Sequence, residues 1–140
     1  MRIMALDVGD RKIGVAMSDP EGLLASPLTT ISRISDGQAI EGIRRLVDEY
    51  QVECVVVGLP YSLNGGVGAQ AEKVFAFVQK LHKSLPIDIK MRDERLSTAA
   101  ADRLLLQAGV KKGRRRSLRD AAAAAFILQG YLDSLRSGDR

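Results

Sequence analysis

The pattern of hydrophobic residues changes its period along the chain. Up to residue 28, apolar side chains form short runs or alternate with small and polar ones, as in β-strands. After Gly37, apolar residues recur every three or four positions, in segments separated by β-branched runs. The predicted elements, in order, are three strands (3–6, 12–18 and 23–28), a helix (40–50), a strand (52–60), a helix (67–85), a strand (87–92) and two helices (97–107 and about 118–136).

This order, βββ-α-β-α-β-α-α, predicts an α/β fold. The first three strands form an antiparallel meander, in which Pro27 places the third strand at an edge or at its own end. The run Val52–Pro60 is apolar on both faces, as in a covered parallel strand. Helices between the later strands imply parallel crossovers. We therefore expect one domain over residues 1–140, a five-stranded mixed sheet with helices on both faces.

Composition narrows the function classes. The chain has one cysteine, Cys54, which is expected in a buried strand, and one histidine, His82, which is expected on the surface of a helix. No Ser-His or Cys-His pair is apparent, which argues against covalent catalysis. The chain starts with a strand rather than a signal peptide, and no apolar run has the length of a membrane span. We expect a soluble, cytoplasmic protein.

Positive charge is concentrated in one segment. The net charge is +4, but the segment 111–119, KKGRRRSLR, holds six basic residues and no acid. Without it, 15 basic and 17 acidic residues remain. Six like charges in a predicted loop favour binding of a polyanion over a merely solvated loop. No aromatic residue lies among them, so base stacking has little support there. The residues expected to hold phosphates are Lys111, Lys112, Arg114, Arg115 and Arg116.

Asp7 is the first candidate for chemistry. It ends a buried strand, at the edge of the sheet where α/β proteins bind ligands, and Gly9 follows it. A buried, unpaired carboxylate is costly, so this side chain must be neutralised, solvated or bound to a cation. The alternative is that Asp7 caps the hairpin turn. The pattern Asp-x-Gly does not decide between the two interpretations. The facing strand has a small face, Gly14, Ala16 and Ser18.

Two further acidic sites reach the same edge. Asp93 and Glu94 end the fifth strand, but strict alternation lets only one of them join Asp7, and periodicity does not say which. Their alternative role is to stabilise a helix start. Asp120 begins the last helix, where it also fits a capping box with Ser117. The alanines 121–125 would let this helix pack close to the sheet.

Three carboxylates from separate elements would form a site for a hard cation. Oxygen ligands suit Mg²⁺ or Mn²⁺, and the sequence has no Cys/His cluster for zinc. Such sites activate water and stabilise the leaving oxygen in phosphodiester hydrolysis. The residues thus point to a metal-dependent nuclease.

Four segments carry a resemblance to a known family. The stretches ALDVGDRKIGVAMSD, VVVGLPYSLNGGVGAQA, DERLST and DAAAAAFILQGYL are similar to those of the YqgF/RuvX family, which has a ribonuclease H-like fold. Its members are described as RuvC-like Holliday junction resolvases and as pre-16S rRNA nucleases. The resemblance implies Asp7, Glu94 and Asp120 as metal-binding acids. It also implies that Asn64 lines the substrate cleft. We expect Arg95, beside Glu94, to help the basic residues position the strand.

The chain departs from RuvC-type resolvases at two places. Those enzymes carry a Glu at the end of the fourth strand, where this chain has residues 58–60, Gly-Leu-Pro. Glu53 lies at the opposite end of that strand and cannot replace it. The second Asp of their last helix corresponds to Ala123. Three acids are therefore expected where RuvC-type enzymes have four.

The leading hypothesis is a Mg²⁺- or Mn²⁺-dependent nuclease that processes the 5′ end of precursor 16S rRNA. The close alternative is a Holliday junction resolvase, whose symmetric cutting needs a twofold homodimer. A third hypothesis is a non-catalytic RNA-binding factor in ribosome assembly. A phosphotransferase of the actin/sugar-kinase type would need a second lobe, which 140 residues cannot hold.

Overall fold

The computed structural model describes residues 2–60, 68–94, 106, 109 and 112–136, with the backbone alone for 60, 94 and 112–118. The elements are β1 (Arg2–Val8), β2 (Lys12–Ser18), β3 (Ala25–Ser32), α1 (Asp36–Tyr50), β4 (Val52–Pro60), α2 (Ala69–Ser84), β5 (Asp88–Glu94) and α4 (Lys112–Arg136). The strands form one sheet in the order β3-β2-β1-β4-β5. Antiparallel pairs join β1 to β2 and β2 to β3, and parallel pairs join β1 to β4 and β4 to β5. The predicted five-stranded mixed sheet is confirmed.

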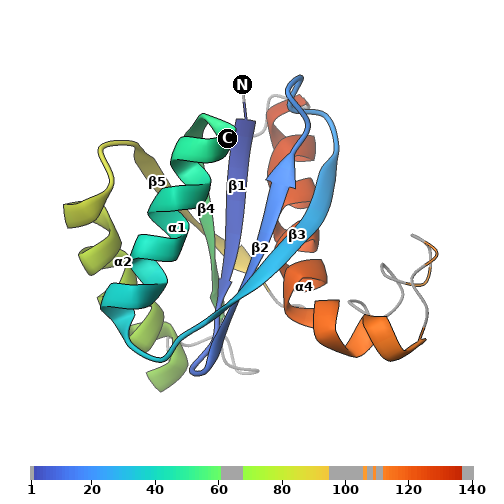
Figure 1. Cartoon of the computed structure of the whole chain (residues 1–140). Coiled ribbons are helices and arrows are strands. Elements are labelled where there is room, and N and C mark those ends of the chain that lie inside the picture. Colours follow the sequence, from blue (N-terminus) through green and yellow to red (C-terminus); the bar gives the residue numbers. More distant parts are fainter. Residues whose placement is uncertain (1, 61–67, 95–105, 107–108, 110–111, 137–140) are drawn as a thin grey trace.

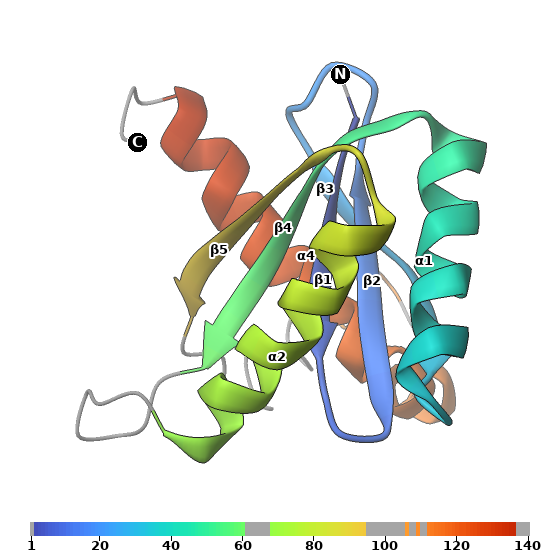
Figure 2. The same ribbon diagram turned by 90° about the vertical axis from the view of Figure 1, so that its left-hand side faces the viewer.

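Helices cover both faces of the sheet, as predicted. Helices α1 and α2 lie on one face and α4 lies on the other (Figures 1 and 2). Two core clusters correspond to these layers. The larger one joins α1 and α2 to the sheet through residues such as Leu6, Val57 and Phe77. The smaller one joins α4 to the sheet through residues such as Ala5, Val56 and Leu128.

The two clusters show how each strand divides its side chains. In β1, Met4, Leu6 and Val8 belong to the α1/α2 face, whereas Ile3 and Ala5 belong to the α4 face. Side chains alternate along a strand, so Asp7 points to the α4 side. In β4 the same rule gives Val55, Val57 and Leu59 to the α1/α2 face.

Helix α1 ends at Tyr50 as predicted, but it starts at Asp36 rather than at residue 40. Ser35 is the N-cap of α1, and its side chain accepts a hydrogen bond from the N–H of Gln38. The helix buries the stripe Ala39, Ile40, Ile43 and Val47. It stops at Gln51, which has a left-handed φ of 56°.

The third strand lies further along the chain than predicted. Leu23 and Leu24 are apolar, but their N–H groups donate to the Asp19 carboxylate at 2.7 and 3.2 Å and so belong to a turn. The strand runs instead from residue 25 to 32 and is an edge strand. Its register shifts at Pro27, which pairs with Ala16 next to the Val15–Thr29 pair. The expectation that Pro27 marks an edge strand is confirmed.

The last helix starts earlier than predicted. It begins at Lys112 rather than near 118, so most of the basic segment is helical and not a loop. Ser117 lies inside the helix, and its predicted role as N-cap is wrong. Lys and Arg are good helix formers, which explains how the helix extends through this segment.

The predicted helix 97–107 lies outside the described residues except for Leu106. Gly109, predicted to end it, has a φ of 78°, and its N–H donates to the Leu106 carbonyl at 3.0 Å. None of the helices in the described part of the chain has the length and apolar character needed to cross a membrane.

Candidate metal and nuclease site

The candidate site lies at the carboxyl end of the parallel strands. Strands β1, β4 and β5 run in the same direction, so they end at one edge of the sheet. Asp7 stands near the end of β1, where it pairs with Gly14 of β2. At the end of β4, Pro60 pairs with Glu94 of β5. This is the edge at which open α/β sheets bind ligands.

Gly14 determines how closely α4 approaches Asp7. A Cβ atom on Gly14 would lie 1.9 Å from the backbone oxygen of Asp120 and 2.9 Å from the nitrogen of Ala121. The helix backbone therefore rests directly on the strand residue that pairs with Asp7. The alanines 121–125 that follow are all buried, which confirms that small residues let this helix pack closely. The missing side chain at position 14 thus brings the Asp120 segment beside Asp7.

The environment of Asp7 opposes its negative charge. Burial first, and then the charge of Asp120, raise the pKa of Asp7 from 3.8 to about 6. Within the described part of the chain, no group donates a hydrogen bond to this carboxylate. The adjacent turn is closed instead by the Gly9 N–H, which donates to the Lys12 carbonyl at 2.9 Å. The capping role considered for Asp7 is therefore not supported.

The register of β4 and β5 separates Asp93 from Glu94. Leu59, which pairs with Asp93, belongs to the α1/α2 core. Gly58 belongs to the opposite face, because a Cβ there would lie 2.4 Å from the Ile127 side chain of α4. Position 94 is two residues beyond the partner of Gly58, so it lies on the α4 face with Asp7. The geometry agrees here with the choice of Glu94 that the resemblance implies.

A side chain of helix α4 occupies the space next to Gly58 near the end of β4. The segment 58–60, where the sequence has no fourth acid, includes Gly58, at which a Cβ would lie 2.4 Å from the Ile127 side chain. No side chain fits at position 58 unless Ile127 moves. Ala123, which the resemblance aligns with the second helical Asp of RuvC-type enzymes, is buried. Among the side chains that the structure describes, which do not include that of Glu94, no three His, Cys, Asp or Glu residues gather into a metal site.

The predicted nucleic-acid-binding residues lie largely beyond what the structure describes. Asn64, Arg95 and Lys111 are outside the described residues. The backbone of the other four, Lys112, Arg114, Arg115 and Arg116, forms the first turns of α4. Figure 1 shows these first turns set at an angle to the rest of α4 and extending past the sheet. Binding of a polyanion by this segment stays a prediction.

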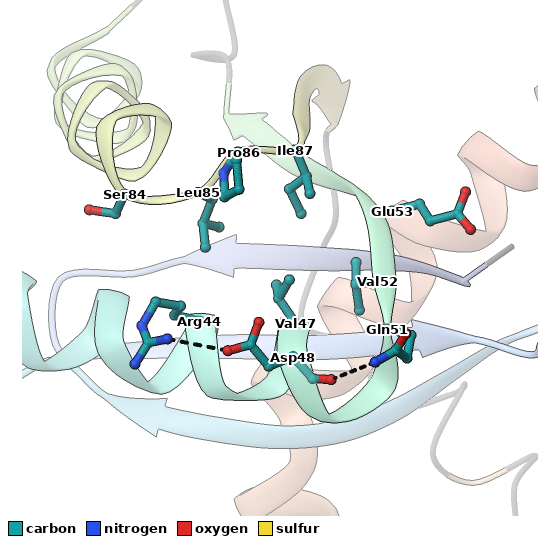
Figure 3. Close-up of a pocket in the computed structure, with 10 residues that line it drawn as sticks. All are labelled: Arg44, Val47, Asp48, Gln51, Val52, Glu53, Ser84, Leu85, Pro86 and Ile87. Carbon is teal, nitrogen blue, oxygen red and sulfur yellow. Dashed lines mark hydrogen bonds and ion pairs between the residues drawn. The ribbon is translucent and has the colours of Figure 1, made fainter.

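A separate hollow lies at the other end of the sheet. It has a volume of ≈ 710 Å³, and the residues that line it include Val52 and Glu53 at the start of β4 (Figure 3). Val52 pairs with Arg2 at the start of β1, so this hollow is remote from Asp7. Its polar groups bond one another, as in the Arg44–Asp48 ion pair at 3.2 Å. The hollow is not part of the candidate site.

Comparison with known proteins shows the family to which the chain belongs. A sequence model of the RuvX family, described as Holliday junction resolvase, matches residues 1–134. A Clostridium botulinum protein named "Putative pre-16S rRNA nuclease" is 49% identical over 135 residues, which cover 96% of this chain and 98% of the relative. A protein of the same name from Desulforamulus reducens is 50% identical over 134 residues, which are 96% of this chain and 98% of that one.

Solved structures with the same fold are more distant in sequence. The T. thermophilus RuvC in complex with a Holliday junction substrate superposes with a TM-score of 0.65 at 16% identity, covering 99% of this chain and 98% of that one. The Fowlpox virus resolvase bound to Holliday junction DNA gives 0.61 at 15% identity, covering 96% and 99%. These likenesses show the ribonuclease H-like fold. The match over residues 1–134 and the identity to its relatives show that the chain belongs to the RuvX family.

Proposed function

We propose that this protein is a divalent-metal-dependent nuclease that hydrolyses phosphodiester bonds in precursor 16S rRNA, at its 5′ end, in the cytoplasm. One observation carries the proposal. Asp7 is a half-buried carboxylate with a pKa of about 6, placed beside Asp120 at the ligand-binding edge of the sheet. A pair of acids held together in this way is unfavourable unless a cation binds between them. The names of the relatives supply the substrate class.

The donor atoms at this edge fit a hard cation such as Mg²⁺ or Mn²⁺. Asp7 and Asp120 offer carboxylate oxygens, and we assign the third carboxylate to Glu94 from its register position. The sulfur and imidazole ligands that would favour zinc are elsewhere: Cys54 is buried near the start of β4, and His82 is exposed on α2. When bound, such an ion lowers the pKa of water and stabilises the charge on the phosphate and leaving oxygen.

The residues of the chain have distinct parts in this proposal. Gly14 keeps the backbone of α4 against β2, so that two carboxylates from opposite ends of the sequence share one site. Desolvation first, and then the charge of Asp120, keep the pKa of Asp7 high in the free protein, so that proton and metal compete for the same oxygens. The basic turns at the start of α4, with Arg95 and Asn64, would hold the RNA backbone across the edge of the sheet.

The second candidate function is cleavage of four-way DNA junctions. The family description and the fold of the RuvC-type neighbours favour it. The name shared by the relatives favours RNA processing instead. A junction resolvase would also have to form a twofold homodimer in order to cut two strands symmetrically. A non-catalytic assembly factor is the third candidate.

The test is cleavage of two substrates by three proteins. Wild type, Asp7→Asn and Asp93→Asn are incubated with a precursor 16S rRNA fragment and with a four-way DNA junction, in Mg²⁺ and in Mn²⁺. We expect wild type and Asp93→Asn to cut the RNA and Asp7→Asn to be inactive, because Asp93 belongs to the opposite face of the sheet. Preferential cutting of the junction would favour the resolvase. Binding without cutting by any of the three would favour the assembly factor.

A further inference from the structure

Arg33 is a mostly buried arginine between the end of β3 and the start of α1. Its side chain is 14% exposed. Nη1 donates to the carbonyl of Gly9 at 2.8 Å, and Nε donates to the carboxylate of Asp36 at 2.8 Å. Its Cζ lies 4.8 Å from the centre of the Phe77 ring, which is fully buried in α2. One guanidinium therefore joins the β1–β2 turn, the first turn of α1 and the middle of α2.

Residue 33 binds the β1–β2 turn at two points. Besides the side-chain bond to Gly9, its backbone N–H donates to the Arg11 carbonyl at 2.8 Å. The turn is itself tight, because a Cβ on Gly9 would lie 2.7 Å from the Lys12 carbonyl oxygen. Gly9 comes two residues after Asp7. The chain leaving Asp7 is thus fixed from the α1/α2 side, while the Asp7 side chain points to α4.

The contacts made by the side chain at position 33 require an arginine rather than a lysine. Its guanidinium makes two directed hydrogen bonds and stacks on an aromatic face at the same time, which the single ammonium of lysine cannot do. Asp36 is held in place from its other side by Lys80, whose Nζ lies 2.7 Å from Oδ2. The hydrogen bonds from Arg33 and then from Lys80 keep the pKa of Asp36 below its usual value. The arginine is therefore held in one orientation by a carboxylate that is ionised at neutral pH.

We propose that Arg33 is a positioning residue of the Asp7 site: by fixing the turn that follows Asp7, it aligns the carboxylate with Asp120 for metal binding. It acts through the backbone of Gly9, and among the described side chains it has no hydrogen bond or ion pair with Asp7 or Asp120. The inference rests on the proposed function of the site. Outer partners that orient metal ligands typically contribute 10- to 100-fold in affinity or activity.

The test compares the same substitution at two arginines. Arg33→Lys keeps the charge and removes the paired hydrogen bonds and the stacking. Arg44→Lys is the matched control, because Arg44 also bonds two carboxylates, Glu41 and Asp48, but on the outer surface of α1. Arg33→Met is a stronger variant that removes the charge as well. If it does not fold, Arg33→Lys still decides the question.

Three quantities are measured at a temperature at which every variant is folded. The first is hydrogen exchange of the Gly9 amide, which reports on the turn independently of activity. The second is the Mn²⁺ dissociation constant in the absence of RNA. The third is cleavage of a precursor 16S rRNA fragment, with kcat and KM determined separately.

In Arg33→Lys we expect exchange at Gly9 to become at least about 10-fold faster. We also expect Mn²⁺ affinity and kcat to fall by about 10- to 100-fold. The KM for RNA should stay within about twofold, because no RNA-binding residue has changed. Arg44→Lys should leave all three quantities unchanged.

The outcomes separate this inference from the proposed function. If wild type binds Mn²⁺ and cuts RNA, but Arg33→Lys changes neither the Mn²⁺ affinity nor kcat, Arg33 is structural and the inference is wrong. Faster Gly9 exchange without weaker Mn²⁺ binding would also overturn the inference. If wild type neither binds Mn²⁺ nor cuts RNA, the proposed function itself fails, and the role of Arg33 in aligning metal ligands fails with it.

Discussion

Replacing Asp7 by asparagine should stabilise the metal-free protein at neutral pH. The pKa of Asp7 is about 6 in the folded state against an ordinary value of 3.8, so folding disfavours the charged form. The contribution of this group to stability is fully present below pH 3.8 and is lost as the pH rises through about 6. The difference between the two pKa values means that ionised Asp7 lowers the free energy of unfolding by about 3 kcal/mol. This figure is an upper limit, because solvent screens part of the effect.

The assay is urea unfolding of wild type and Asp7→Asn in EDTA between pH 4 and pH 8. The difference in unfolding free energy should be small at pH 4, should grow up to about pH 6 and should be constant above about pH 7. Asp93→Asn, which removes an exposed carboxylate from the other face at the same end of the sheet, should show no such rise. A difference that is absent, or that does not change with pH, would refute the assignment of this carboxylate to a buried, repulsive environment.

Adding metal should remove most of the difference in stability between wild type and Asp7→Asn. Mn²⁺ at about 100 times its dissociation constant would stabilise wild type by about 2.7 kcal/mol. The Asp7→Asn protein should gain much less, because it lacks a charged ligand. At pH 7 the two proteins should then have similar stability. If Mn²⁺ stabilised both proteins equally, its binding site would lie away from Asp7.

Three further substitutions test how the site is built. Gly14→Ala should lower kcat by about 100-fold and the free energy of unfolding by about 1–3 kcal/mol, because its Cβ would clash with the Asp120 carbonyl. Gly37→Ala is the control and should leave cleavage unchanged, because a Cβ there would meet nothing within 4 Å. Glu94→Gln should weaken Mn²⁺ binding measured by calorimetry, whereas Asp93→Asn should not, since the two positions lie on opposite faces; equal effects would mean that the β4–β5 register is wrong. Gly58→Ala should lower the free energy of unfolding, measured by thermal unfolding, by about 1–3 kcal/mol. The loss should be smaller in an Ile127→Val background, because that change removes the Cδ1 atom that the new methyl group would meet.

The local pattern of apolar and polar residues was sufficient to predict the positions of most strands of the sheet. Strands β2 and β4 lie where alternation and a β-branched run place them, because their side chains are buried on both sides. The error in β3 arose from the side chain of Asp19, whose carboxylate binds two backbone N–H groups and keeps two leucines in a turn. The early start of α4 shows that helix propensity prevailed over charge repulsion, a balance that the sequence alone did not decide.

The candidate site could be predicted only in part. Asp7 and Asp120 stood out because acids are unusual beside buried apolar runs. The choice between Asp93 and Glu94 depends on how β5 pairs with β4, which is a tertiary property. Arg33 gave no sequence signal, because its partners at Gly9 and Phe77 come from segments on either side of it in the chain.

The contact between Gly14 and Asp120 has a consequence during synthesis of the protein. The two acids stand near opposite ends of the chain, and α4 is the last described element to leave the ribosome. The sheet can form first, but Asp7 and Asp120 cannot meet until α4 docks. A growing chain would therefore carry an incomplete site while it is still attached to the ribosome. A nuclease of the kind proposed above would thus become active only after α4 has been synthesised and has docked on the sheet.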